Sequence, residues 1–167
     1  MVYDFWLSLG LQKKKLFLAI NICLIFFFFV LRDVESNEVK IIDGDTIHLN
    51  GEKIRFTGID TPELKQTCTK NNEVIYCGIK ARKLLIEKIG KNKVQCVREG
   101  KDQYKRTLAE CFVNKVSLSS YLVRNGYAFA YRRYSTKFIR DEDFARTNNL
   151  GMWSMTFDYP WDYRKKN

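Results

Sequence analysis

The chain has 167 residues, a formal net charge of +10, five cysteines and one histidine. Its length suits one compact domain with an appendage, and its basic excess favours a polyanionic partner such as nucleic acid, anionic lipid or an acidic glycan. Because the only histidine is His48 and no two cysteines are separated by just two residues, a zinc site is disfavoured.

An apolar run from Leu16 to Leu31, broken only by Asn21, follows the three lysines Lys13–Lys15. It is longer than the roughly 7–15 residues of a signal-peptide core and shorter than the roughly 20 of a comfortable membrane span. No small-residue cleavage site follows it. We therefore expect residues 1–32 to be an uncleaved transmembrane anchor, with a cleaved signal segment as the alternative. Because the lysines should stay inside, the rest of the chain is expected outside the cytoplasm, either membrane-anchored or, after cleavage, secreted or periplasmic.

Strand-like patterns begin after a polar linker at residues 33–37. The Asp43-Gly44-Asp45 turn joins the first two predicted strands, and the Asn50-Gly51 dipeptide, a strong hairpin signal, joins the second to the third. These segments predict an antiparallel meander with strands at 39–42, 46–49 and 53–57.

The remaining pattern predicts two more strands and about three helices. The expected elements are a loop at 68–78, a helix at 79–89 ending at Gly90, strands at 93–98 and 107–113, a helix at 117–124 followed by Gly126, an extended segment at 127–131 and a helix at 136–148. Five short strands with helices around them suggest a small Greek-key β-barrel with α-helices, and the OB-fold is the commonest such shape of this size. This domain is expected to cover residues 38–164.

Four cysteines lie beyond the apolar run, an even number that fits two disulfides in an oxidising compartment. If strands 93–98 and 107–113 form an antiparallel hairpin, Cys96 lies opposite Cys111, within disulfide reach. Cys68 would then pair with Cys77.

Acidic residues gather near two of the predicted turns. Asp45 lies in the first turn, and Asp60-Thr61-Pro62-Glu63 follows the third strand. In a meander the two sites can be neighbours, and carboxylates with a backbone carbonyl are hard oxygen ligands suited to Ca²⁺. Each motif alone is also an ordinary turn or helix-start signal. Arg55 adds a guanidinium beside them, which is able to bind two phosphate oxygens and stabilise a five-coordinate phosphorus.

Three ordered stretches resemble the signatures of the staphylococcal nuclease (thermonuclease) family. They are Asp43-Gly44-Asp45-Thr46, then Ile54-Arg55-Phe56 with Gly58-Ile59-Asp60-Thr61-Pro62-Glu63, and the turn Asp102-Gln103-Tyr104-Lys105-Arg106. Further similar stretches, Pro160-Trp161-Asp162-Tyr163-Arg164 among them, extend the resemblance over about residues 37–164. The resemblance implies a nuclease that cleaves DNA and RNA with little sequence preference and leaves 3′-phosphate ends.

The resemblance also implies a role for each site residue. Ca²⁺ would be held by Asp45, Asp60 and the carbonyl of Thr61. Glu63 would activate the attacking water, and the scissile phosphate would be bound by Arg55 and Arg106.

Lys105 departs from the family, which has glycine at this position. If the turn needs a positive φ, lysine is strained there by about 1–2 kcal/mol, or else the turn changes and aims Arg106 differently. An extra cation at this position is equally able to help hold the phosphate chain.

Aromatic and basic residues are predicted to bind the nucleic-acid strand, because rings stack on bases and cations attract phosphate. These residues are Tyr104, Lys105, Tyr131, Arg132, Arg133 and Tyr134. The alternating aromatic residues of 127–131 would also suit a core. General attraction for nucleic acid is expected from a further set of basic residues, which are Lys70, Lys137, Arg140, Arg164, Lys165 and Lys166.

The main alternative to an enzyme is a catalytically weak or inactive nucleic-acid-binding module, and a third reading is an envelope domain whose basic face meets anionic lipid. All six active-site positions hold the residue types that the chemistry needs, which favours the enzyme. We expect a monomer that acts on DNA and RNA and meets the membrane through its N-terminal segment.

Overall fold

A computed structural model of the chain describes residues 37–167. The anchor predicted at 1–32 and all but the last residue of the predicted linker lie outside the described residues. Within residues 37–167, no helix combines the length and the apolar character that crossing a membrane requires.

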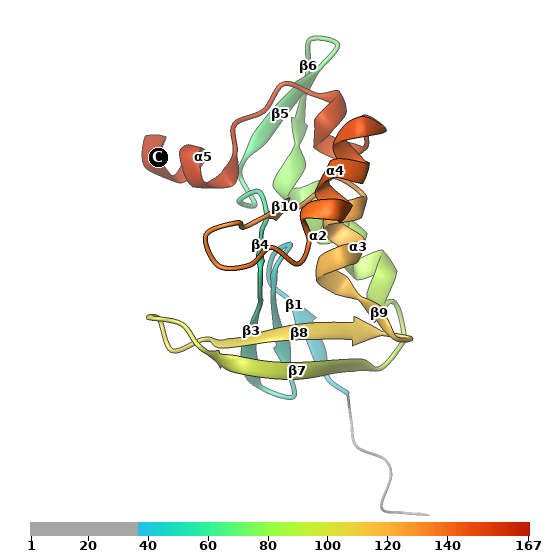
Figure 1. Cartoon of the computed structure of the whole chain (residues 1–167), viewed down its shortest axis with the longest axis vertical. Coiled ribbons are helices and arrows are strands. Elements are labelled where there is room, and N and C mark those ends of the chain that lie inside the picture. The colour runs from blue at the N-terminus through green and yellow to red at the C-terminus, as the bar shows by residue number, and fades with distance from the viewer. Residues whose placement is uncertain (1–36) are drawn as a thin grey trace, which may run out of the picture. The chain divides into compact units, whose positions relative to one another are not determined.

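A six-stranded sheet carries the predicted meander (Figure 1). Its strands are β1 (Val39–Ile41), β2 (Thr46–Leu49), β3 (Glu52–Phe56), β7 (Val94–Lys101), β8 (Thr107–Val113) and β9 (Val116–Ser117). The first three pair antiparallel in sequence order, β8 joins β3 in parallel, and β7 and β9 both pair antiparallel with β8. The order β1-β2-β3-β8-β7 is compatible with the expected OB-like fold, with β9 as one strand more than the five predicted.

The hydrophobic core lies against one face of β3. Ile54 and Phe56 are buried in it, together with Leu85 of α2 (Cys77–Ile89) and Leu122 of α3 (Leu118–Arg124). Because side chains alternate along a strand, Arg55 projects from the opposite face of β3. The core therefore determines which way Arg55 points.

The stretch 68–78, expected to be a loop, forms a second hairpin instead. β5 (Thr67–Lys70) pairs antiparallel with β6 (Glu73–Tyr76). Asn71 and Asn72 form its two-residue turn, with φ of 50° and 66°. Two consecutive positive φ values are typical of the type I′ turns that favour hairpins, and asparagine tolerates them better than most residues. The loop prediction was therefore wrong.

Both predicted disulfides are present. Cys96 lies opposite Cys111 in the β7–β8 ladder and is bonded to it. The Cys68–Cys77 bond joins β5 to the first residue of α2, with the Cα atoms 5.8 Å apart.

The three expected helices are present, and the described residues contain one more α-helix and a 3-10 helix. α2 ends at Gly90 as predicted, α3 has Ser117 as its N-cap, and α4 covers Ile139–Thr147. A 3-10 helix, η2 (Gly151–Ser154), and a short helix, α5 (Pro160–Lys166), follow. The sequence prediction missed α5, because seven residues are too few for a periodic apolar pattern. Proline at the first position was its one local signal.

Candidate active site

Asp45 is buried in the turn between β1 and β2, with only 2% of its surface exposed. Its amide donates to Asp43 Oδ1 at 3.0 Å, and its carbonyl accepts from the Phe56 amide at 2.8 Å. A Cβ on Gly44 would lie 2.9 Å from the Thr61 side chain. The glycine therefore lets the turn approach the segment that contains Thr61.

Asp60 ends the short strand β4 (Ile59–Asp60) and is completely buried. β4 pairs with β10 (Phe129–Ala130), where Asp60 lies opposite Phe129. Only these two residues of the extended segment predicted at 127–131 form a strand. The Thr61 amide donates to Asp45 Oδ2 at 3.2 Å, across 16 residues of sequence. The two acidic sites are therefore neighbours, as the meander predicted.

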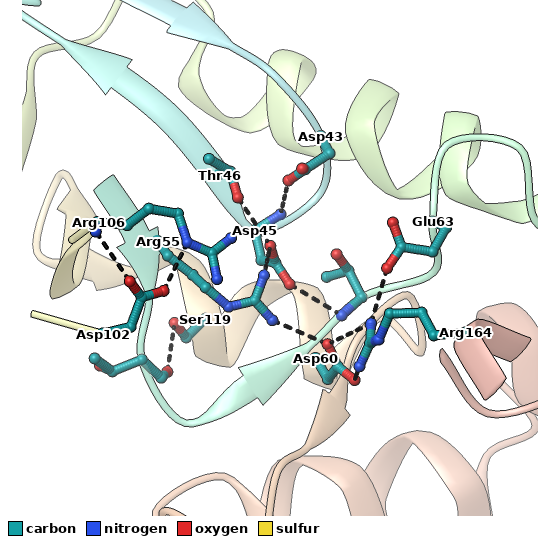
Figure 2. A network of polar contacts seen from close by, with 12 residues as sticks. Asp43, Asp45, Thr46, Arg55, Asp60, Glu63, Asp102, Arg106, Ser119 and Arg164 are labelled. Atoms are coloured by element: carbon teal, nitrogen blue, oxygen red, sulfur yellow. Dashed lines mark hydrogen bonds and ion pairs between the residues drawn. The ribbon is translucent and has the colours of Figure 1, made fainter. Parts of the chain in front are cut away.

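Arg55 joins the two buried carboxylates with one guanidinium group. Its Nη1 donates to Asp45 Oδ1 at 2.6 Å and its Nη2 to Asp60 Oδ1 at 3.0 Å (Figure 2). Thr46 lies opposite Arg55 in the β2–β3 ladder, which places Arg55 beside Asp45. Burial opposes the charged form of Arg55, but the charges of Asp45 and Asp60 outweigh it, so the pKa of the guanidinium is raised.

The surroundings of the buried Asp45 carboxyl raise its pKa. Burial raises its pKa from 3.8 to about 7, although the charge of Arg55 opposes this effect. The nearby carboxylates of Asp43 and Asp60 raise it further, and the hydrogen bond from Thr61 lowers it. A cation bound at this carboxylate would favour its ionised form and release a proton.

The oxygen donors of Asp45, Asp60 and Thr61 are of the kind that Ca²⁺ prefers. Within residues 37–167, no three His, Cys, Asp or Glu side chains are grouped so that they could hold a metal ion. Two carboxylates and the Thr61 carbonyl supply only part of the roughly six to eight oxygens that Ca²⁺ takes. The residues fit the ion as a partial site only, in which water or substrate phosphate would have to supply the other ligands.

Glu63 combines a fixed backbone with an accessible carboxylate. Its side chain is 45% exposed. The buried Gln66 accepts from the Glu63 amide at 3.2 Å through Oε1 and donates its own amide to the Glu63 carbonyl at 2.8 Å. Gln66 Nε2 also donates to the carbonyl of Asp158 at 2.7 Å. Sequence reasoning missed Gln66, because a glutamine outside every predicted strand and helix carries no signal of burial.

The turn before β8 holds Arg106 through Asp102. Asp102 Oδ1 accepts from the Arg106 amide at 2.9 Å, and its Oδ2 accepts from Arg106 Nε at 2.6 Å. Burial tends to raise the pKa of Asp102, but the hydrogen bonds and charge of Arg106 lower it overall. Lys105 has a φ of 61°, so the turn keeps a positive φ and lysine adopts it.

Arg106 directly precedes β8, and the alternation of that strand, continued by one residue, would place Arg106 on the side of the sheet where Arg55 lies. Leu108 pairs with Arg55 in the parallel β3–β8 ladder, and Arg106 precedes Leu108 by two residues. Figure 2 shows the Arg106 side chain extending toward the Asp45–Arg55 pair. The contacts of the Arg106 side chain are with Asp102 and Tyr104, so its role in phosphate binding stays a prediction.

Arg164 of α5 contacts the carboxylates of Asp60 and Glu63, which sequence reasoning did not anticipate. Its Nη2 donates to Asp60 Oδ2 at 2.6 Å, and its Nη1 donates to Asp60 Oδ1 at 3.2 Å and to Glu63 Oε1 at 2.8 Å (Figure 2). Burial opposes its charge, but the hydrogen bonds and charges of Asp60 and Glu63 prevail and raise the pKa of the guanidinium. Arg164 therefore belongs to the site and supplies more than general attraction.

The residues predicted to bind the nucleic-acid strand lie in two regions of the structure. Tyr104 is exposed in the turn before β8, with its ring centroid 5.4 Å from the Arg106 guanidinium carbon. Tyr131, Arg132 and Arg133 line a cavity of about 450 Å³. Other residues that line it are the aromatic Trp153, Tyr159 and Trp161 and the basic Arg146 and Lys165.

Three of these residues have partners within the domain that also give them a structural role. Arg132 forms an ion pair with Glu142 of α4. The exposed Tyr134 contacts the Tyr131 ring edge-on, with the centroids 5.0 Å apart. Tyr131 in turn stacks on Trp161 at 6.1 Å. The Tyr131 ring thus packs inside the domain as well as lining the cavity.

The family model described as staphylococcal nuclease homologue matches residues 53–155, which is more than half of the chain. Arg55, Asp60, Thr61, Glu63 and Arg106 lie inside the matched stretch. Asp45 and Arg164 lie outside it.

Several proteins are similar to most of this chain. An uncharacterized endonuclease of Haemophilus influenzae is 32% identical over 123 residues, which are 70% of this chain and 64% of that protein. A micrococcal nuclease of Shigella flexneri is 28% identical over 151 residues, covering 80% and 82%. A probable staphylococcal-like nuclease of rice, CAN2, is 29% identical over 141 residues, but the chain spans only 36% of its length.

Proposed function

Because the chain belongs to the staphylococcal nuclease family, we propose that it is a Ca²⁺-dependent endonuclease that hydrolyses DNA and RNA phosphodiesters with low sequence specificity. One observation carries the proposal: a single guanidinium, that of Arg55, joins Asp45 and Asp60, with Glu63 three residues beyond Asp60. Carboxylates, an accessible base and an arginine are the groups that phosphodiester hydrolysis requires.

Asp45, Asp60 and the Thr61 carbonyl would hold the Ca²⁺ ion. Bound there, the ion would neutralise phosphate charge and polarise the scissile P–O bond. Burial of both carboxylates supports this role, because a buried acidic pair is stabilised by a cation. The Thr61–Asp45 hydrogen bond keeps the two ligand segments together.

Glu63 would act as general base. Its exposed carboxylate would take a proton from a water molecule as that water's oxygen forms a bond to phosphorus. The bond from phosphorus to the 5′-oxygen would then break, and the leaving oxygen would take a proton from a water molecule to become a 5′-hydroxyl. The phosphate stays on the 3′ side, which gives the 3′-phosphate ends that the family resemblance implies.

Arg55 and Arg106 would donate to the phosphate oxygens. A guanidinium has five N–H donors, and the Arg55 contacts to Asp45 and Asp60 leave some of them for substrate. The Asp102 carboxylate would orient Arg106 from behind. Both arginines would stabilise the extra charge of the five-coordinate transition state.

We propose that the nucleic-acid strand runs past the turn before β8 and the cavity beside α5. The residues assigned to it are Tyr104, Lys105, Tyr131, Arg132, Arg133 and Tyr134. The exposure of Tyr104 and Tyr134 and the cations around the cavity support this path. Contacts to rings and phosphates would give little sequence preference.

We propose further that the sheet closes as an OB-fold barrel and that the domain, residues 38–164, works as a monomer outside the cytoplasm. The strand order and the parallel β3–β8 pair support the first proposal. Two disulfides support an oxidising compartment. The chain would be anchored by residues 1–32 or, if they are cleaved, secreted or periplasmic. The test is treatment of intact cells with an external protease, after permeabilisation of the outer membrane if they have one. If the domain survives this treatment, export is refuted.

The decisive experiment is digestion of single-stranded DNA and of RNA by the purified chain, with Ca²⁺ or with EGTA. Release of acid-soluble nucleotides should need Ca²⁺, and Glu63→Ala should abolish most of it. Binding of nucleic acid without release over hours would instead support the inactive binding module. Vesicle binding with no Ca²⁺ requirement and no effect of Glu63→Ala would support the envelope-domain alternative.

A further inference from the structure

Arg164 brings a positive charge to the place where the proposed function puts a metal ion. It comes from α5, 104 residues after Asp60, and beyond the stretch that matches the family model. Figure 2 shows its guanidinium between the carboxylates of Asp60 and Glu63.

The hydrogen bonds of Asp60 show how much of this carboxylate Arg164 takes. Asp60 Oδ1 accepts from both Arg55 and Arg164, whereas Oδ2 accepts from Arg164 alone among the described residues. A carboxylate has about four lone-pair sites on its two oxygens, and a buried one has no bulk water to fill them. A divalent cation at Asp60 would therefore meet a guanidinium already bound to the same oxygens, and the two positive charges would repel each other.

The second contact of Arg164 reaches Glu63, the proposed base. The same Nη1 atom donates to Asp60 Oδ1 and to Glu63 Oε1. One side chain thus ties the proposed metal ligand to the proposed base.

Contacts that do not involve Arg164 hold the start of α5. Trp161 stacks on Tyr159 with the ring centroids 4.6 Å apart and on Tyr131 at 6.1 Å. Gln66 Nε2 donates to the carbonyl of Asp158, two residues before the helix begins. The Arg164 side chain is 40% exposed, so its guanidinium is able to turn toward solvent or a phosphate while the start of the helix stays in place and its end loosens.

We propose that Arg164 is a positioning residue that acts as the built-in counter-cation of the metal site. It holds Asp60 and Glu63 in the metal-free protein and gives up Asp60 when a divalent cation binds. This inference rests on the proposed function, because it needs a cation at Asp60. Its consequence is that Arg164 lowers the affinity of the site for the metal and releases Glu63 only once the metal is present.

The neighbouring lysines of α5 provide matched controls. Lys165 forms an ion pair with Asp162, and Lys166 forms one with Asp158. Within residues 37–167, neither lysine forms a hydrogen bond or ion pair with Asp60 or Glu63. Lys165→Gln therefore removes the same charge from the same helix without touching Asp60.

The test is calorimetric titration of the full-length chain with CaCl₂, which measures binding and not activity. Arg164→Gln should bind Ca²⁺ at least about fivefold more tightly than the wild type, in the range of typical coupling between sites, whereas Lys165→Gln should match the wild type. A folded Arg164→Gln protein with equal or weaker affinity would overturn the inference.

Hydrogen exchange of the wild-type chain gives a second readout that needs no variant. Ca²⁺ should speed amide exchange in the peptide that contains residues 162–167, because the helix end loses its contact with Asp60; slower or unchanged exchange would overturn the inference even if Arg164→Gln does not fold. A wild-type chain that binds no Ca²⁺ would overturn the proposed function itself. A wild type that binds Ca²⁺ and cleaves DNA, with Arg164→Gln unchanged in affinity, would overturn only the role of Arg164.

Discussion

Gly78 lies directly against the backbone of Glu63. A Cβ built on Gly78 would fall 1.9 Å from the Glu63 carbonyl oxygen and 2.5 Å from its carbonyl carbon. Since backbone atoms are unable to yield as a flexible side chain does, any side chain at position 78 must displace the segment that carries Glu63.

Gly78→Ala is therefore expected to lower kcat for digestion of single-stranded DNA and to destabilise the fold by about 1–3 kcal/mol, as overpacking does. Gly51→Ala is the control, because Gly51 has a φ of 82° but nothing within 4 Å of its Cβ position. That variant should lose stability and keep its kcat. Equal kcat values for Gly78→Ala and the wild type would show that the contact does not position Glu63.

Arg55→Lys should lower kcat by about 10²–10³. A lysine ammonium is a compact charge that lacks the planar fork with which Arg55 reaches both Asp45 and Asp60. Steady-state digestion with saturating Ca²⁺ measures the effect. Arg98→Lys, at the exposed ion pair with Glu52, should leave the rate unchanged. An active Arg55→Lys enzyme would contradict the assignment of the guanidinium to phosphate binding.

The raised pKa of Asp45 predicts how stability depends on pH when metal is absent. Between pH 3.8 and about 7 the folded protein keeps a proton on Asp45 that the unfolded chain has lost. The folded state then binds more protons, so this group makes the free energy of unfolding fall as pH rises through that window. Asp45→Asn removes the effect. In urea titrations with EGTA, the stability of the wild type relative to the variant should decrease from about pH 4 to about pH 7. A difference that is constant or increases with pH would contradict the shift.

Lys105→Gly should stabilise the protein by up to about 1 kcal/mol. Glycine removes the cost of the left-handed backbone at this position, although it also gives the unfolded chain more freedom. Asn114→Gly, at a φ of 50° that asparagine already tolerates, should gain less. Urea unfolding measures both variants, and a destabilised Lys105→Gly protein would mean that the lysine side chain makes a compensating contact.

Short sequence patterns at the turns predicted most strands of the six-stranded sheet. The Asn50-Gly51 dipeptide predicted its hairpin, and the polar turn between β7 and β8 placed Cys96 opposite Cys111. The turn at Asn71 and Asn72 uses the same backbone geometry without a glycine, so the sequence did not reveal it. α5 was missed for another reason: it is under two turns long, and its stability comes from the packing of Trp161 rather than from helix propensity.

The same distinction applies to the site. Asp45, Arg55 and Asp60 were predicted to meet because a meander brings adjacent strands together, and their contacts confirm it. The contact between Arg164 and Asp60 depends on how a distant helix packs. No feature of the neighbouring sequence distinguishes Arg164 from Lys165, the next basic residue on α5, so the sequence did not show which of the two contacts Asp60. The catalytic roles of these residues stay predictions.

The parallel pairing of β3 with β8 has a consequence for the order in which the protein folds. Ile54 lies opposite Thr107 in that ladder, and parallel neighbours are unable to form through a tight turn, so this pairing closes a long loop and is kinetically slow. An early species with only the β1–β2–β3 meander would contain Arg55 beside Asp45 but would lack Arg106. During refolding, the recovery of enzymatic activity should therefore coincide with the slow, global phase and have no earlier component.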